Sequence, residues 1–70
     1  MVDFYKRKTM AYDLIGRLLL EHKSIKEIEL VVAEQFGFAR IFVLKYINTL
    51  VEAGHLKLLN NGGDYELIKK

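Results

Sequence analysis

The chain has 70 residues, of which 51% are hydrophobic, and it contains no cysteine and no proline. This length allows a single domain with a small core, and the lack of cysteine excludes both a disulfide framework and a thiolate metal site. The formal net charge of +2 permits a polyanionic partner but is far below that of an architectural DNA-coating protein.

The apolar stretches of the sequence are short. They include Leu18–Leu20 and Ile41–Leu44, which are well below the ~20 residues that a membrane span needs. The basic start without a long apolar run predicts no signal peptide, and the absence of cysteine fits a reducing compartment. We therefore expect a soluble cytoplasmic protein with no membrane partner.

Residues 1–8 are predicted to form an N-terminal basic arm, which carries Lys6, Arg7 and Lys8. Two interpretations stay open for this arm, a solvated terminus and an electropositive contact to nucleic acid. Residues 9–70 contain no repeat, linker or low-complexity tract, and they are predicted to form one domain.

The first predicted helix runs from Thr9, as the N-cap, to about His22. Apolar residues repeat along it at spacings of three and four, which predicts a core-facing stripe of Ala11, Leu14, Ile15 and Leu18. Further apolar residues extend beyond this face, and surplus apolar surface of this kind favours burial against a second subunit. These residues are Tyr12, Leu19 and Leu20, and they lead us to expect a homodimer.

The second predicted helix begins at Ser24 and ends at Gly37. Ser24 and Glu27 have the spacing of a capping box, and a glycine after the last periodic residue is typical of a helix end. The expected buried residues are Ile28, Val31, Val32 and Phe36, and the expected solvent-facing residues are Lys26, Glu27, Glu29 and Glu34.

The third predicted helix spans residues 39–53, with Gly54 after it. The short glycine-containing turn between this helix and the preceding one indicates a helix-turn-helix. A helical wheel places Val43, Tyr46, Ile47 and Leu50 on the inner side and Lys45, Asn48 and Glu52 on the outer side.

Residues 55–69 are predicted to form a β-hairpin. Apolar and charged residues alternate at Leu56–Leu58 and Tyr65–Leu67, and the intervening Asn60-Asn61-Gly62-Gly63 contains residue types that accept positive φ. The side carrying Leu56, Leu58 and Leu67 is expected to pack on the helices. The predicted fold class is α+β, three helices followed by a two-stranded antiparallel hairpin.

The segment Val32–Arg40 reads VAEQFGFAR and is followed by Val43, Ile47, Leu50 and the tetrapeptide Val51–Gly54. This pattern resembles winged helix-turn-helix transcriptional regulators of the broad ArsR and MarR-like class, and the resemblance covers residues 24–68. It implies sequence-specific binding of double-stranded DNA, with helix 39–53 in the major groove and hairpin 55–69 as the wing.

Carried over by position, the resemblance implies that Arg40 starts the recognition helix, where Ala39 replaces the usual serine or threonine. Arg40 and Asn48 have the side chains that pair with guanine and adenine, and Lys45 is suited to phosphate. Thr49 continues the same outward face. In the wing and arm, the expected DNA contacts are Lys57, Asn60, Asn61, Lys6, Arg7 and Lys8.

Ile41–Leu44 departs from the pattern, since the family usually has small polar residues there around one buried branched side chain, a position that Val43 fits. Three explanations remain open. Ile41 can contact thymine methyl groups, Phe42 and Leu44 can be additional core or a dimer contact, or the whole face can bind another protein. The last explanation defines the alternative function, a protein-interaction module that does not read DNA.

The sequence does not favour an enzyme. Its two histidines, His22 and His55, have no cysteine or carboxylate cluster beside them, and no glycine-rich phosphate loop joins a strand to a helix. We expect no catalytic, metal or cofactor site, and no domain for a small-molecule effector.

Overall fold

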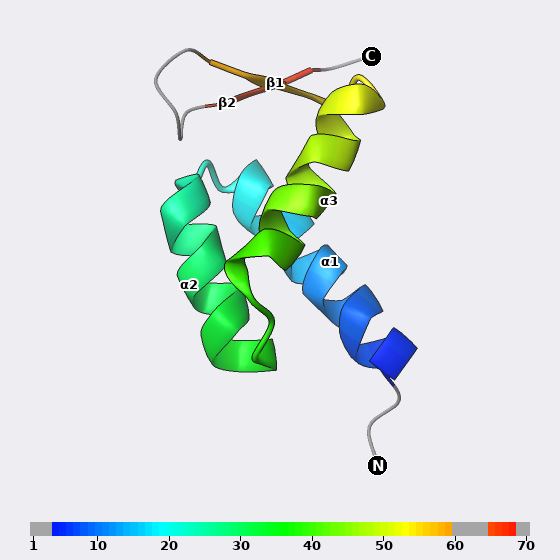
Figure 1. Ribbon diagram of the computed structural model, residues 1–70. Helices are drawn as coiled ribbons and strands as arrows, with labels where there is room; N and C mark the ends of the chain where they lie inside the picture. Colours follow the sequence, from blue (N-terminus) through cyan, green and yellow to red (C-terminus); the bar gives the residue numbers. More distant parts are fainter. Residues whose placement is uncertain (1–3, 60–64, 69–70) are drawn as a thin grey trace.

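The structure is a computed structural model, and it describes residues 4–59 and 65–68. Three helices, α1 (Phe4–Leu20), α2 (Ile25–Phe36) and α3 (Arg40–Glu52), precede an antiparallel hairpin of β1 (Leu56–Leu58) and β2 (Tyr65–Leu67). The predicted fold class is therefore confirmed. The helices pack around one another, and the hairpin lies across one end of the bundle (Figure 1). Within the described residues, none of the helices is long and apolar enough to cross a bilayer.

Helix α1 begins earlier than predicted. Its first residue is Phe4, and Thr9 is not an N-cap but an interior residue whose hydroxyl donates to the Tyr5 carbonyl at 2.9 Å. Lysine and arginine are good helix formers, and the Phe4 ring packs edge-on against Phe38, with ring centroids 6.2 Å apart. Residues 4–8 of the predicted arm therefore belong to the helix, and residues 1–3 lie outside the described part.

Helix α1 ends in a turn that is usually built on glycine. His22 has a φ of 60°, and its amide donates to the Leu19 carbonyl at 3.0 Å, while the Lys23 amide donates to the Leu18 carbonyl at 3.0 Å. These two bonds form a Schellman motif with His22 in the left-handed position. A residue with a side chain is strained in this conformation.

Helix α2 has the predicted ends. Ser24 caps it by accepting from the Glu27 amide at 3.1 Å, and Gly37, with a φ of 72°, closes it by donating to the Ala33 carbonyl at 2.9 Å. Helix α3 follows after a short turn. Its N-cap, Ala39, makes no side-chain hydrogen bond, as expected for a residue without a hydroxyl.

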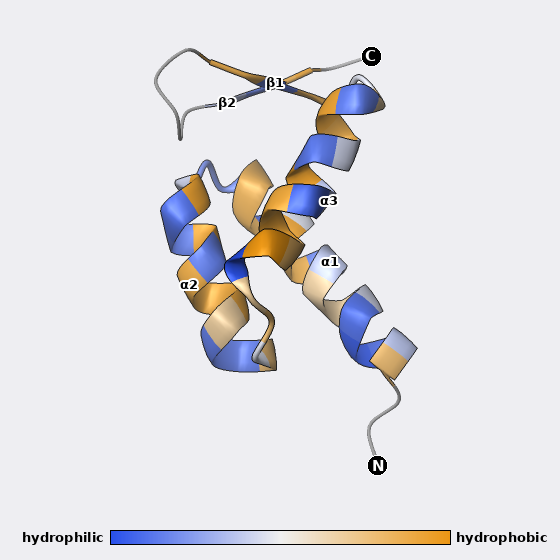
Figure 2. Cartoon of the chain, viewed as in Figure 1, coloured by the Kyte–Doolittle hydropathy of each residue, from blue (hydrophilic) through white to orange (hydrophobic). Residues whose placement is uncertain are grey.

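The core lies where the apolar sides of the three helices meet (Figure 2). Its fully buried residues include Ile15 from α1, Ile28 from α2 and Val43 from α3. Leu19 was predicted to be surplus surface, and this is wrong, since it is buried one turn beyond Ile15. Leu14 and Leu18, predicted as core, are only partly buried beside it.

Leu56 and Tyr65 both attach the hairpin to the bundle. Leu56 is buried in the core, and the Tyr65 hydroxyl donates to the carbonyls of Lys23 at 2.6 Å and Leu19 at 3.3 Å. Both acceptors lie where α1 ends and the connection to α2 begins. Leu58 was predicted to pack on the helices, but it is 44% exposed, at the end of β1 where the loop to β2 begins.

Candidate nucleic-acid interface

The residues predicted to contact DNA on α3 all lie on its solvent side. Arg40, Ile41, Lys45, Asn48 and Thr49 are exposed, and their spacings of three and four place most of them along one face. The opposite side of the helix carries the buried Val43 and Ile47. Folding therefore leaves the predicted reading face uncovered by the rest of the described chain.

An aromatic stack joins this helix to α1. The ring centroids of Phe38 and Phe42 are 4.2 Å apart, those of Phe42 and Tyr12 are 5.2 Å apart, and those of Tyr12 and Tyr46 are 4.2 Å apart. The planes within each pair differ by 20° or less. Phe42 is thus held between two rings within the chain, and the additional-core explanation applies to it.

Leu44 is also partly buried against the core. Of the apolar residues that depart from the family pattern, only Ile41 is largely solvent-exposed, at 58%. The apolar character of the face is therefore mostly interior packing, and the outer surface of α3 is more polar than its sequence suggests.

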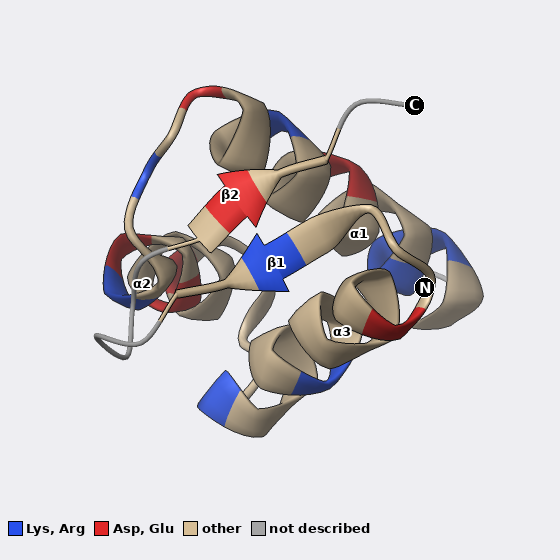
Figure 3. Ribbon diagram, turned by 90° about the horizontal axis from the view of Figure 1, so that it is seen from above, with Lys and Arg blue, Asp and Glu red and all other residues tan. Residues whose placement is uncertain are grey.

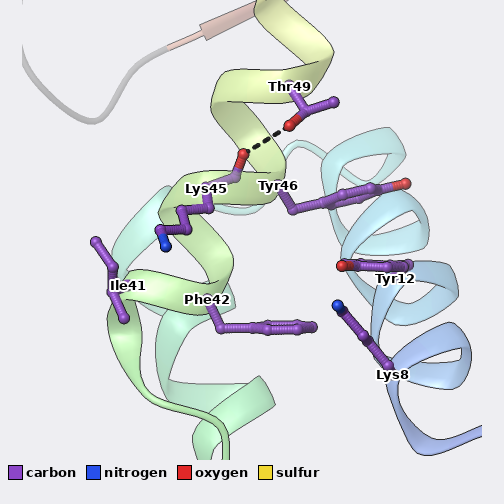
Figure 4. A pocket seen from close by; sticks show the side chains of 7 residues that line it. All are labelled: Lys8, Tyr12, Ile41, Phe42, Lys45, Tyr46 and Thr49. Atoms are coloured by element: carbon purple, nitrogen blue, oxygen red, sulfur yellow. Dashed lines mark hydrogen bonds between the residues drawn. The ribbon is translucent and has the colours of Figure 1, made fainter. Parts of the chain in front are cut away.

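A groove of about 500 Å³ runs between α1 and α3 beside the aromatic stack (Figure 4). Lys8 and Tyr12 line it from α1. From α3 it is lined by Ile41, Phe42, Lys45, Tyr46 and Thr49. The Lys8 ammonium lies 6.0 Å from the centroid of the Tyr12 ring, within the range of a cation–π contact. The groove therefore has a cation from each helix and an aromatic wall.

Two hydroxyl groups in the groove have defined states. Burial, together with the neighbouring Tyr12 and Asp13, raises the pKa of Tyr46 above its usual value of 10.0, so its hydroxyl keeps its proton to a higher pH than that of an exposed tyrosine. Thr49 donates its hydroxyl proton to the Lys45 carbonyl at 3.0 Å. In this rotamer the Thr49 hydroxyl offers a ligand lone pairs rather than a proton.

Arg40 is paired within the chain. Its Nε lies 3.6 Å from Oε2 of Glu29 on α2. Glu29 was predicted to face water, and this is wrong, because its side chain is only 15% exposed. The Arg40 side chain remains 76% exposed, so the pair holds the arginine without covering it.

The three basic residues of the predicted arm lie in different surroundings. Lys6 is exposed, whereas Arg7 is half-buried with its guanidinium 5.1 Å from the centroid of the Phe38 ring. The Nε of Arg7 is buried and has no hydrogen-bond partner among residues 4–59 and 65–68. Arg7 is thus mainly a packing residue, and Lys8 is the one that lines the groove with Lys45.

The hairpin contributes one described candidate, Lys57. It is exposed on β1 and lies directly opposite Glu66 of β2, so basic and acidic residues face each other across the hairpin (Figure 3). This arrangement reduces the net positive charge of the strands. The predicted contacts at Asn60 and Asn61 lie outside the described residues.

No family model matches the sequence, and the searches of curated proteins and of solved structures likewise gave no match. The order of three helices and an antiparallel hairpin is compatible with a winged helix-turn-helix. Sequence reasoning missed the Glu29 pairing and the Tyr65 attachment, since each joins elements that are far apart along the chain.

Proposed function

We propose that the protein is a transcriptional regulator that binds double-stranded DNA sequence-specifically, with α3 in the major groove and the hairpin as the wing. The observation that carries this proposal is the groove in which Lys8 and Lys45, from two helices, lie beside the exposed face of α3. A duplex backbone presents a phosphate row alongside its major groove. One cation on the reading helix, Lys45, and one on the neighbouring helix α1, Lys8, are suited to hold that row.

The exposed side chains of α3 have complementary roles in this arrangement. Arg40 lies in the first turn of α3, and the first residues of a recognition helix are those that contact base edges. The Asn48 amide has one donor and one acceptor group, and these can pair with the major-groove edge of adenine. Lys45 lies between Arg40 and Asn48 in the sequence and is suited to phosphate. Ile41 supports the same interpretation, because an exposed aliphatic side chain can pack on a thymine methyl group.

The test is the salt dependence of binding to a fluorescent duplex of random sequence, measured by anisotropy. Replacing Lys8 or Lys45 with alanine is expected to weaken binding and to reduce the slope of log K against log salt by about 0.9 each, because each lysine neutralises one phosphate. Arg17→Ala is the matched control. It removes a positive charge from the same helix as Lys8, but about 180° around it, and is expected to leave the slope unchanged.

The rival function is a protein-interaction module without DNA reading. The sequence suggested this function through its apolar residues on α3, but Phe42 and Leu44 pack against the core. Exposed apolar residues remain in and next to the hairpin, at Leu58 and Leu59. Undetectable binding of any duplex at low salt would replace the DNA proposal with this rival. Equal affinity for selected and random duplexes would instead reduce the proposal to nonspecific nucleic-acid binding.

We also propose that the protein acts as a homodimer, because a single domain covers only a short DNA site. Leu20 at the end of α1 is 71% exposed and lies beside an apolar hollow of about 280 Å³ lined by Leu67 and Ile68. Sedimentation equilibrium is expected to show a dimer that Leu20→Lys dissociates. Leu30→Lys, at an exposed leucine on α2, is the control, and a wild-type monomer at micromolar concentration would contradict this proposal.

A further inference from the structure

The ion pair between Glu29 and Arg40 lies at the start of the proposed reading helix. The carboxylate comes from α2 and is largely buried, whereas the guanidinium belongs to the first residue of α3 and is largely exposed. Two shallow hollows adjoin the pair, and Lys26, Glu29 and Arg40 line both of them. Leu44 and Leu58 contribute to one hollow, and Leu30 and Ala33 to the other, so aliphatic side chains and the Lys26 side chain surround the pair.

The geometry of the pair leaves the outer edge of the arginine available. Glu29 Oε2 approaches Nε, at 3.6 Å, which is the side of the guanidinium nearest its own chain. A guanidinium has five N–H donors in a fixed planar fork. The distance of 3.6 Å is that of an ion pair rather than of a hydrogen bond, and the side chain is 76% exposed, so the guanidinium can donate to an outside partner with two adjacent acceptors.

The charge of the pair determines which acceptors suit it. The Glu29 carboxylate offsets the positive charge of Arg40 and repels a phosphate that approaches the same nitrogens. The major-groove edge of guanine is uncharged and presents N7 and O6 side by side, so it gains two hydrogen bonds without that repulsion.

We propose that Glu29 is a positioning residue that directs Arg40 toward a guanine edge rather than toward backbone phosphate. This inference rests on the proposed DNA-binding function and adds to it a source of sequence discrimination. Glu29 lowers the affinity for DNA in general and raises the preference for one base. The residue touches no DNA itself and acts through the arginine.

The first experiment compares wild type with Glu29→Gln, which keeps the size of the side chain and removes its charge. Selection from a random duplex pool supplies the preferred duplex, and a scrambled duplex of equal composition is its control. Glu29→Gln is expected to bind the scrambled duplex more tightly and to steepen the salt slope by about 0.9, because the released Arg40 then contacts phosphate. Its preference for the selected duplex is expected to fall about tenfold.

The second experiment locates the guanine. Each guanine of the selected duplex is replaced in turn by 7-deazaguanine, which lacks the N7 acceptor. For wild type, one position is expected to weaken binding about tenfold. Arg40→Ala is expected to lose sensitivity at that position, and Glu29→Gln to show much less of it. Sensitivity retained in Arg40→Ala would overturn the assignment of this guanine to Arg40.

Further variants separate positioning from general electrostatics and from folding. Adding Glu29→Gln to Arg40→Ala is expected to leave the preference for the selected duplex unchanged, since Glu29 acts only through Arg40. Glu29→Asp keeps the charge but shortens the side chain, and it is expected to keep the wild-type salt slope while losing discrimination. If Glu29→Gln fails to fold by circular dichroism, the loss of preference for the selected duplex in Glu29→Asp is the test of the positioning role.

The outcomes are distinguishable. If wild type binds no duplex, the proposed function fails and this inference fails with it. If wild type binds the selected duplex and responds to Lys45→Ala, but neither Glu29 variant changes the slope or the preference, the function stands and the positioning role is overturned.

Discussion

Replacing Tyr65 with phenylalanine tests how the hairpin is held on the bundle. The change removes the hydroxyl that donates to the Lys23 carbonyl at 2.6 Å and the Leu19 carbonyl at 3.3 Å, and it retains the ring. A net hydrogen bond contributes about 0.5–1.5 kcal/mol to stability. In the variant, the Leu19 carbonyl still accepts from the His22 amide. The hydrogen bond to the Lys23 carbonyl is exposed, so water can take the place of the lost hydroxyl.

We therefore expect Tyr65→Phe to lower the free energy of unfolding by about 1 kcal/mol. For a domain of this size, that corresponds to a fall in Tm of about 4–8 °C. Urea denaturation followed by far-ultraviolet circular dichroism measures the change. Tyr12→Phe is the control, because the described residues contain no hydrogen-bond partner for its hydroxyl.

The same contact predicts a pH dependence. Burial raises the pKa of Tyr65 in the folded state above its usual value of 10.0, so the folded state keeps this proton at a pH where the unfolded state loses it. The stability due to this group is therefore complete below pH 10.0 and falls as the pH rises through the folded pKa. Tyr65→Phe should flatten the alkaline loss, leaving the part due to Tyr46, whose pKa is also raised.

Equal stability of Tyr65→Phe and wild type, with unchanged denaturant slopes, would refute this reasoning. It would mean that the hydroxyl contacts are no better than those the hydroxyl makes with water.

Three further changes test the helix ends and the core, each by urea denaturation. His22→Gly relieves the left-handed strain and is expected to stabilise the protein by about 1 kcal/mol; a loss would show that the imidazole makes a compensating contact. Ala39→Ser supplies the missing N-cap oxygen and is expected to add about 1 kcal/mol, whereas no gain would mean that the first amides of α3 are already satisfied. Ile28→Ala creates a cavity and is expected to cost about 2–5 kcal/mol, against less than about 0.5 kcal/mol for the exposed Leu30→Ala; similar losses would contradict the assigned core.

The features predicted correctly from sequence are encoded over a few neighbouring residues. Ser24 caps α2 through an amide three residues away, and Gly37 ends it through its own backbone conformation. The alternation at residues 56–58 and 65–67 similarly carries its own pairing pattern. Signals of this kind do not depend on what packs against them.

The errors involve residues whose environment is set by distant parts of the chain. Phe4 begins α1 and packs against Phe38, a contact that the basic residues directly after Phe4 do not indicate. Helix α1 is apolar on several sides, so its sequence does not identify Leu19 as more buried than Leu18. Glu29 is covered because it meets Arg40 of the next helix.

For the candidate interface, the outward face of α3 follows from its helical period. The groove does not, because it needs Lys8 of α1 and Lys45 of α3 to come together. The Tyr65 attachment links residues 42 and 46 positions apart. Contacts over such distances are set by the packing of whole elements.

The aromatic stack gives the chain an optical property. The protein contains no tryptophan, so its near-ultraviolet circular dichroism arises from tyrosine and phenylalanine, including the paired rings of Tyr12 and Tyr46 between α1 and α3. A state that retains helices but loses side-chain packing loses near-ultraviolet signal and keeps far-ultraviolet signal. The two spectra together therefore distinguish loss of side-chain packing, including that of the stack between α1 and α3, from melting of the helices themselves, without any added label.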